Sequence, residues 1–232
     1  MEPGPGAAGQ HLGDAVHGPV DLIAADHQRR GETHHVEFGL LGEHALFHEQ
    51  FADMVGVDPV GVELDAGEAI PALDEYDALI SMGGPMDVFD VAEHPWLVTE
   101  KSAIREAVQE RGMAFLGACL GHQLLAEALG GTVARMALPE VGLMAVSRTA
   151  AGGTDPLFDG LDDTLACLQW HGCEIATLPA GCDVLASSSA CRVQAIRVGQ
   201  HAYGLQFHVE MTAQTVAEWA SIPAYEQSLE AA

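Results

Sequence analysis

A cysteine flanked by glycines, Cys119, limits what this chain can fold into more than any other feature. It lies in the sequence Gly-Ala-Cys-Leu-Gly-His-Gln, between the apolar residues 113–116 and the helix-forming residues 124–129. The pattern predicts a strand, a sharp turn and a helix, because glycine permits tight backbone geometry. A nucleophile elbow has this layout: the side chain projects from the sheet and the next amide can bind an oxyanion. The positive N-terminal end of the helix would favour a thiolate at Cys119.

A catalytic cysteine needs a base, and the base needs a group that orients it. Residues 202–207 read as a buried strand, and His208 and Glu210 follow it. Residues two apart in an extended chain point to the same side, so Glu210 can hold His208 in one tautomer. We therefore predict a Cys119–His208–Glu210 triad. His171 competes as the base, but it lacks a carboxylate two residues further on.

Three motifs in this chain resemble those of the class I, triad-type glutamine amidotransferases, and of their stand-alone GMP-synthase-like members in particular. They are Met82-Gly83-Gly84-Pro85, Gly117-x-Cys119-x-Gly121-His122-Gln123 and Gln206-Phe207-His208-x-Glu210. The resemblance runs from about residue 60 to about residue 220. Many members carry proline where this chain has Val209, and valine also favours the extended backbone.

The resemblance implies roles for further residues. The amides of Gly84 and Leu120 would form the oxyanion hole, and Gln123 would contact the substrate. Residues 139–142 match a family segment near the substrate. The reaction would be hydrolysis of a γ-glutamyl amide through a cysteine thioester, with release of ammonia. It requires no cofactor and no metal.

Predicted strands alternate with predicted helices, which favours a parallel sheet covered by helices on both faces. We expect a flavodoxin-like, doubly wound α/β fold with the three motifs at the carboxyl ends of strands. A helix is expected over 96–110, and a small antiparallel extension from strands at 132–134 and 141–149. The other expected strands are 60–64, 78–82, 113–116, 164–170, 183–189, 193–198 and 202–207.

The N-terminal region fits the family less well. Residues 1–33 are rich in Gly, Pro and Ala and are predicted to be a disordered extension. The amidotransferase domain is expected over 34–222, followed by a tail at 223–232. The first strand of the family's sheet has only a weak candidate at 36–41. Helices are expected at 45–55 and 213–220.

Composition excludes several classes of function. The chain has 9 basic and 34 acidic residues, a formal net charge of −25, so nucleic acid and anionic membranes are not expected partners. Five cysteines without a CxxC pair suggest neither a zinc site nor a disulfide framework. His34, His35, His44 and His48 lack an HExxH pattern, so no metal site is predicted. Neither a secretory signal nor an apolar run long enough to span a membrane is present, so we expect a cytoplasmic protein.

The sequence leaves three alternatives for the function of the chain. The chain could be a glutaminase subunit that serves a separate synthetase, since no nucleotide-binding motif is present. It could be a free-standing hydrolase or transpeptidase of γ-glutamyl peptides or conjugates. It could also be a non-catalytic binding module on the same fold. In the first two cases its small-molecule partner is glutamine or another γ-glutamyl compound.

Overall fold

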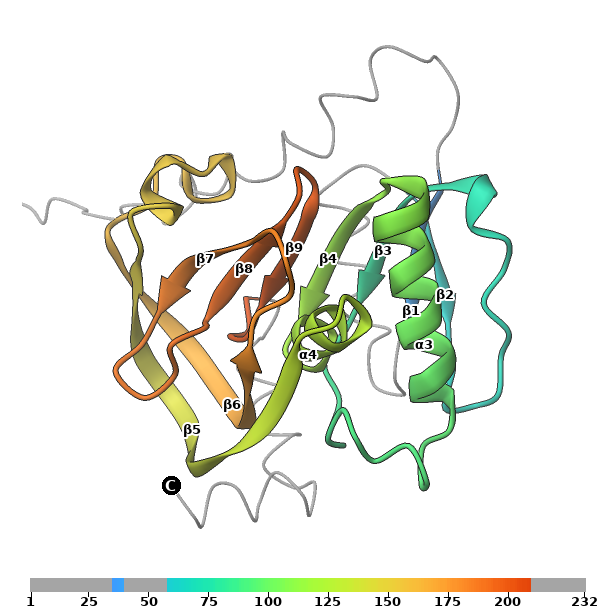
Figure 1. The fold of residues 1–232 in the computed structure, drawn as a ribbon, viewed down its shortest axis with the longest axis horizontal. Helices are drawn as coiled ribbons and strands as arrows, with labels where there is room; N and C mark the ends of the chain where they lie inside the picture. Colours follow the sequence, from blue (N-terminus) through green and yellow to red (C-terminus); the bar gives the residue numbers. More distant parts are fainter. Residues whose placement is uncertain (1–34, 40–57, 210–232) are drawn as a thin grey trace, which may run out of the picture.

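One continuous sheet organises the part of the chain that the computed structural model describes, residues 35–39 and 58–209 (Figure 1). Its nine strands follow the order β2-β1-β3-β4-β9-β8-β7-β5-β6. Their bounds are β1 His35–Gly39, β2 Asp58–Val62, β3 Tyr76–Ser81, β4 Ala114–Ala118, β5 Thr132–Arg148, β6 Thr164–Thr177, β7 Cys182–Ser187, β8 Ala195–Val198 and β9 Ala202–Leu205.

The sheet changes character at β9. Strands β2, β1, β3, β4 and β9 pair in parallel, and β8, β7, β5 and β6 continue the sheet with antiparallel pairings. This confirms the predicted α/β fold with a parallel sheet and an antiparallel extension. The weak strand candidate at 36–41 is confirmed as β1, which lies between β2 and β3.

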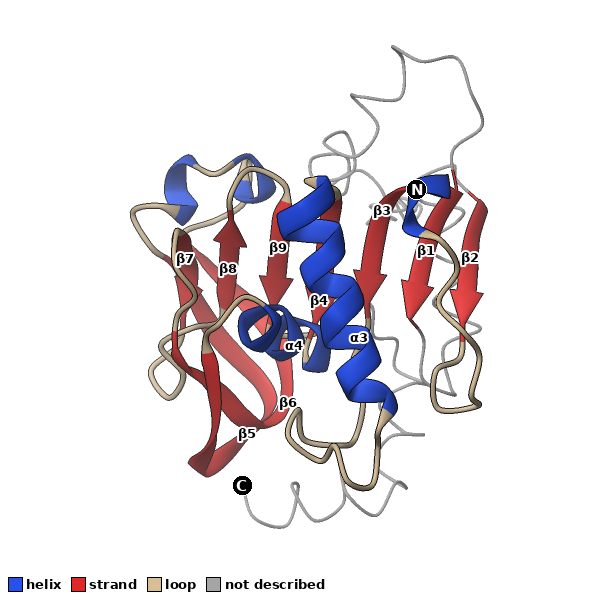
Figure 2. Ribbon diagram, turned by 45° about the vertical axis from the view of Figure 1, so that its right-hand side comes forward, coloured by secondary structure: helices blue, strands red, loops and turns tan. Residues whose placement is uncertain are grey.

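Two helices, α3 (Trp96–Arg105) and α4 (Leu120–Ala128), pack side by side on one face of the sheet (Figure 2). Leu97 and Ile104 of α3 are fully buried, as are Leu124 and Leu125 of α4, and these side chains join one apolar core. Each such side chain contributes about 1.5–3 kcal/mol by leaving water. Within the described ranges, no helix has the length and apolar character needed to cross a membrane.

A second apolar cluster forms on the opposite face of β8 and β9, because side chains alternate along a strand. Ile196 joins the core under the helices, whereas Tyr203 and Leu205 join the second cluster. The short 3₁₀ helices η4 (Gly152–Thr154) and η5 (Pro156–Phe158) lie near this cluster, and Phe158 is buried in it. A 3₁₀ turn, η2 (Leu73–Glu75), precedes β3.

Several elements differ from the sequence prediction. The helix expected over 96–110 is α3 followed by a π-helical segment, η3 (Glu106–Arg111), which ends at the left-handed Gly112. The two strands expected at 132–134 and 141–149 are the single strand β5. Its register shifts between Arg135 and Glu140, where Pro139 cannot donate to the ladder. The elbow helix begins at Leu120 rather than 124, and its first turns contain His122 and Gln123, which are buried despite their polarity.

Some expectations concern residues that are not described. The extension at 1–33, the helices at 45–55 and 213–220, and the tail at 223–232 all lie outside the described residues. The presence of helices on the second face of the sheet therefore stays a prediction.

A buried acid, Glu100, lies between α3 and the sheet. Its side chain is 6% exposed, and Oε1 accepts a hydrogen bond of 2.7 Å from Ser81 Oγ at the end of β3. Apolar side chains surround it, including Leu79, Ala103 and Ile104. Burial raises the pKa of Glu100 to about 7, and the Ser81 hydrogen bond only partly opposes this rise. The folded state therefore favours the protonated acid.

Replacing Glu100 by glutamine tests this assignment. A raised folded pKa means that the stability contributed by the protonated acid is complete below the unfolded value of 4.5 and is lost as pH rises through about 7. Glu100→Gln, which still accepts from Ser81, should be more stable than the parent at about pH 8 by about 3 kcal/mol, and by less than about 1 kcal/mol at about pH 5. Urea unfolding at both pH values measures the difference. A difference that does not change with pH would contradict the assignment.

Candidate active site

Cys119 connects β4 to α4 in a strained backbone conformation. Its φ is 50° and its ψ is −99°, and within the described ranges it is the one non-glycine residue with positive φ. Its amide donates to the carbonyl of Leu205 on β9, at 2.8 Å, which anchors the turn to the neighbouring strand. A residue held in this region costs about 1–3 kcal/mol, and such strain is concentrated at functional sites. The predicted nucleophile elbow therefore has the expected backbone geometry.

Glycine at two positions allows the elbow to pack against β3. A Cβ atom added to Gly117 would overlap the carbonyl oxygen of Gly121, and one added to Gly121 would overlap the carbonyl oxygen of Ser81. The amide of Gly121 also donates to the carbonyl of Met82, at 3.1 Å. The loop after β3, which carries Gly83 and Gly84, is thus held directly against the elbow.

Cys119 and His208 meet across Gly83. A Cβ atom added to Gly83 would lie 3.4 Å from Cys119 Cβ and 3.4 Å from His208 Cε1, so both side chains flank this glycine. Gly84 is the next residue of the same loop and is half-buried. Leu120 is the first residue of α4, where a helix leaves amides without an intrahelical acceptor.

The structure thus gathers most of the predicted site residues, namely Cys119, Leu120, Gly84 and His208, at the carboxyl ends of β3, β4 and β9. Glu210 lies outside the described residues. The sixth predicted site residue, Gln123, lies one turn further along α4 and is buried.

Strand β6 closes one side of the site. The amide of His208 donates to the carbonyl of Leu168 at 2.9 Å, forming an isolated antiparallel bridge beyond the end of β9. Two residues further along β6, the carbonyl oxygen of Trp170 lies 4.0 Å from Cys119 Sγ. Because His208 is 4% exposed and Cys119 6% exposed, the two side chains meet away from bulk solvent.

Two buried glutamines lie behind the sulfur. Nε2 of Gln123 donates to the carbonyl of Cys173, at 3.3 Å, and to Oε1 of Gln206, at 3.1 Å. Nε2 of Gln206 in turn lies 3.7 Å from Cys119 Sγ. In the sequence, Gln206 belongs to a motif but had no predicted role. Its position two residues before His208 was a usable signal, since such residues share a side of an extended chain.

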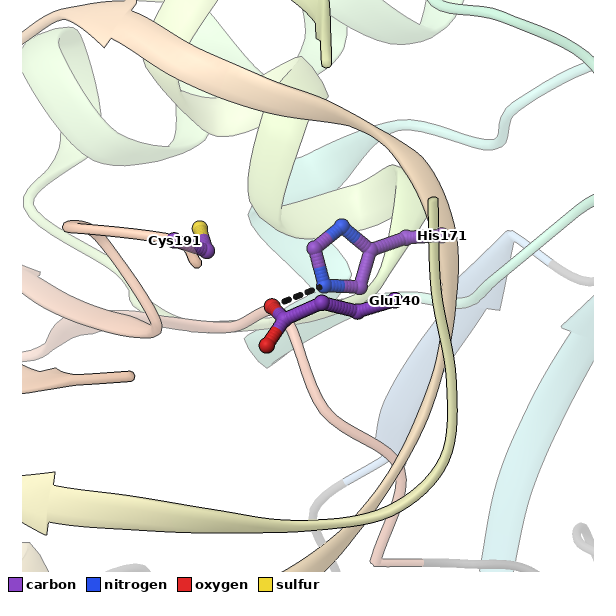
Figure 3. A group of neighbouring side chains, drawn as sticks. All are labelled: Glu140, His171 and Cys191. Atoms are coloured by element: carbon purple, nitrogen blue, oxygen red, sulfur yellow. Dashed lines mark ion pairs between the residues drawn. The ribbon is translucent and has the colours of Figure 1, made fainter. Parts of the chain in front are cut away.

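The other two histidines near the elbow are His122 and His171. His122 is fully buried, and burial is the main cause that lowers its pKa to about 3, so it stays neutral. The ring of His171 has Nδ1 2.9 Å from the carbonyl of Cys173 and Nε2 3.2 Å from Oε2 of Glu140 (Figure 3). Both ring nitrogens of His171 therefore face acceptor oxygens within the protein. The arrangement favours His208 over His171 as the base.

Glu140, on β5, receives a dense set of hydrogen bonds. Ser188 Oγ donates to Oε1 at 2.8 Å, and Gln194 Nε2 donates to Oε2 at 2.7 Å. Burial raises the pKa of Glu140, but the hydrogen bonds from His171, Ser188 and Gln194 outweigh it, so the pKa lies below its usual value. Glu140 is therefore a carboxylate at neutral pH, with its charge compensated inside the protein.

Glu140 and His171 also belong to the one cluster in the described part of the chain whose ligand atoms could surround a metal ion. Glu140, His171 and Cys191 are all buried, and their ligand atoms lie within 4.8 Å of one another (Figure 3). Burial is the main cause that raises the pKa of Cys191 to about 12, and its thiol donates to the carbonyl of Val193 at 3.5 Å. Each of the three side chains therefore has a hydrogen-bond partner within the protein. His34, His44 and His48 lie outside the described residues.

All five cysteines are free thiols. Burial is the main cause that raises the pKa of four of them, to about 11 for Cys167 and Cys182 and to about 12 for Cys173 and Cys191. These four thiols stay protonated at neutral pH and are poor nucleophiles.

Asp87 anchors the loop that follows Gly83 and Gly84. Arg135 on β5 binds Asp87 Oδ2 through Nε and a terminal nitrogen, at 2.9 and 2.6 Å. Cys173 on β6 donates from its thiol to Oδ1 of Asp87 at 3.1 Å. The segment that follows Gly83 and Gly84 is therefore attached to both strands of the β5–β6 hairpin.

Comparison with known proteins gives a consistent family. The model of the family described as glutamine amidotransferase class-I matches residues 42–218, and so begins earlier than the resemblance seen from the motifs. A glutamine amidotransferase-like protein of Salmonella typhimurium, YfeJ, is 36% identical over 155 residues, which are 65% of this chain and 64% of that protein. The chain thus spans less than two thirds of that relative.

Two further relatives carry more specific names. One of the subunits of a glutamine-hydrolysing GMP synthase from Sulfolobus acidocaldarius is 30% identical over 158 residues, 68% of this chain and 78% of that subunit. Gamma-glutamyl peptidase 3 of Arabidopsis thaliana is 30% identical over 151 residues, 63% of this chain and 59% of that protein. Among solved structures, a glutamine amidotransferase from Thermotoga maritima superposes with a TM-score of 0.74 at 28% identity, covering 86% of this chain and 85% of that one.

The contact between the elbow and β3 can be tested with two alanine variants. Gly121→Ala places a methyl group against the Ser81 carbonyl, which cannot move without shifting β3, so we expect a loss of about 3 kcal/mol or more in unfolding free energy. Gly153→Ala is the matched control: nothing lies within 4 Å of its added Cβ, and we expect a change of at most about 0.5 kcal/mol. Denaturant unfolding measures both. Equal stability of the two variants would contradict the close approach at Gly121.

Proposed function

The chain belongs to the class-I glutamine amidotransferase family, and on that premise we propose that it hydrolyses a γ-glutamyl amide through a thioester on Cys119. The observation that carries the proposal is the meeting of two side chains across Gly83. Cys119 is held in a turn with positive φ at the end of β4, and His208 flanks the same glycine from the end of β9. A nucleophile and a base brought together in this way support acyl transfer.

In the proposed reaction, the Cys119 thiolate attacks the side-chain carbonyl carbon of glutamine and forms a tetrahedral oxyanion. The amides of Gly84 and Leu120 stabilise that oxygen, and removal of one such donor costs about 3 kcal/mol in comparable sites. As the carbon–nitrogen bond breaks, His208 gives a proton to the departing ammonia. His208 then takes a proton from water, which attacks the thioester and releases glutamate and the thiolate. Glu210 orients His208 throughout.

The expected contact of Gln123 with substrate is constrained by its surroundings. Both protons of its side-chain amide are used, one by the carbonyl of Cys173 and one by Gln206. A substrate could therefore be recognised by this side chain only through its oxygen. None of the proposed steps routes through a metal or a cofactor.

The similarity to a GMP synthase subunit supports one use of the ammonia. We propose that the chain delivers ammonia to a separate synthetase that activates an acceptor. In that case the isolated chain should hydrolyse glutamine slowly, because partner binding completes such a site. The acceptor belongs to the partner rather than to this chain.

The similarity to a γ-glutamyl peptidase favours a second candidate function. Here the same triad would cleave γ-glutamyl peptides or conjugates without a partner, or transfer the γ-glutamyl group to another amine. The chemistry at Cys119 is identical, and only the leaving group differs. Substrate preference of the isolated chain therefore separates the two candidates.

The central test replaces the proposed nucleophile. Cys119→Ser should lower ammonia release from L-glutamine by at least about a thousandfold, because serine is a far weaker nucleophile at neutral pH. A glutamine-analogue alkylator should label Cys119 in the parent, as read by peptide mass spectrometry. Cys182→Ser is the matched control, since burial raises the pKa of that thiol to about 11, and it should keep both activity and labelling.

Each outcome of this test has a distinct meaning. Faster turnover of a γ-glutamyl dipeptide than of glutamine would favour the peptidase candidate. Labelling of Cys119 with slow turnover of both substrates would favour the glutaminase of a two-protein synthetase. A folded chain with neither labelling nor turnover would sink the enzyme proposal and leave a binding module on the same fold.

A further inference from the structure

The sulfur of Cys119 has a neighbour that the proposed reaction does not use. Gln206 is fully buried, and its Nε2 lies 3.7 Å from Sγ. The carbonyl of Trp170, 4.0 Å from the same sulfur, can accept a hydrogen bond from a thiol but cannot stabilise a thiolate. The side-chain amide of Gln206 can do so, because hydrogen bonds to a charged form favour that form.

The orientation of the Gln206 amide follows from a backbone carbonyl group, which can act only as a hydrogen-bond acceptor. The backbone carbonyl of Cys173 can only accept, so the side-chain atom of Gln123 that faces it, at 3.3 Å, must be nitrogen. The same nitrogen lies 3.1 Å from Gln206, which must therefore present its oxygen there. The nitrogen of Gln206 is then left to face the sulfur. The carbonyl of Cys173 thus determines the orientation of the Gln123 amide, which in turn determines the orientation of the Gln206 amide.

We propose that Gln206 is a further catalytic residue, whose N–H donates to the sulfur of Cys119 and stabilises the thiolate. Gln123 is a positioning residue, which holds Gln206 in the donating orientation. The inference rests on the proposed function, since it concerns the nucleophile of that reaction. It adds a neutral donor that lies on the same strand end as His208, two residues before it.

This donor would act at two steps. Before attack, it increases the fraction of Cys119 present as thiolate. In the second half of the reaction, water attacks the thioester and the carbon–sulfur bond breaks, so the electron pair returns to sulfur and the same N–H stabilises the leaving thiolate. A hydrogen bond to a charged group of this kind corresponds to a change of about tenfold in rate.

The test measures the sulfur directly with iodoacetamide, an uncharged reagent that needs no binding site for glutamine. The rate of alkylation of the Cys119 peptide is followed by mass spectrometry between about pH 5 and pH 10. In Gln206→Met we expect alkylation at about pH 7 to slow by about tenfold, with the pH profile displaced to higher pH. Gln206→Glu can still accept from Gln123 but places a carboxylate against the sulfur, so it should slow alkylation at least as much.

Two comparisons separate a catalytic role from a packing role. Gln123→Leu should displace the profile in the same direction by a smaller amount, because Gln206 remains but loses its fixed orientation. Gln169→Met is the matched control: this buried glutamine donates to Gln194 at 2.9 Å, and its removal should leave the profile of Cys119 unchanged. Denaturant unfolding of each variant confirms which proteins are folded.

Failure of this inference can be distinguished from failure of the proposed function. An unchanged profile in folded Gln206→Met would overturn the inference, and if that variant does not fold, an unchanged profile in Gln206→Glu would do so. An equal displacement in Gln169→Met would also overturn it, since any buried amide would then have the effect. Absence of glutamine turnover and of analogue labelling in the parent would reject the proposed function, while the iodoacetamide profiles would still decide whether Gln206 acts on the sulfur.

Discussion

The approach of Gly121 to the carbonyl oxygen of Ser81 is the contact on which the rest of the site depends. It requires a residue without a side chain, and it brings the end of β3 against the start of α4. The hydrogen bond from Gly121 to Met82 then aligns the glycine loop with the elbow. Because backbone contacts hold the loop against the elbow, the separation between Gly84, Leu120 and the sulfur is set largely by main-chain packing. Such packing changes less than the rotamer of a long side chain.

The sequence predicted those parts of the fold that depend on local pattern. Apolar runs followed by glycine placed β3 and β4 to within a few residues, and the apolar run before His208 placed β9. The alternation of strands and helices indicated the parallel sheet. The helical bounds of α4 were predicted less well, because His122 and Gln123 are polar residues that long-range contacts bury. Strand β5 was divided in two because the irregular pairing near Pro139 depends on its partner, β6.

For the site, the sequence supplied the residues that chemistry names: a cysteine, a histidine and the glycines of a turn. It did not indicate the contacts that Gln206, Glu140 and Asp87 make. Each of these side chains binds a residue distant in the chain: Gln206 binds Gln123, Glu140 binds His171, and Asp87 binds Arg135. A single sequence contains no record of such pairings, since glutamine, glutamate and aspartate are ordinary surface residues when nothing shows what they touch.

The hydrogen bond from Cys119 to Leu205 has a consequence for the order in which the protein is made. Strand β9 is the last of the nine in sequence, yet it lies beside β4, in the middle of the sheet. During synthesis, the ribosome must release the whole β5–β8 segment before β9 can enter that position. Until then the elbow lacks its anchor and His208 is absent. A nascent chain that ends before β9 therefore lacks the contacts that β9 and His208 make with the elbow, and the candidate site is assembled only after β9 has been made.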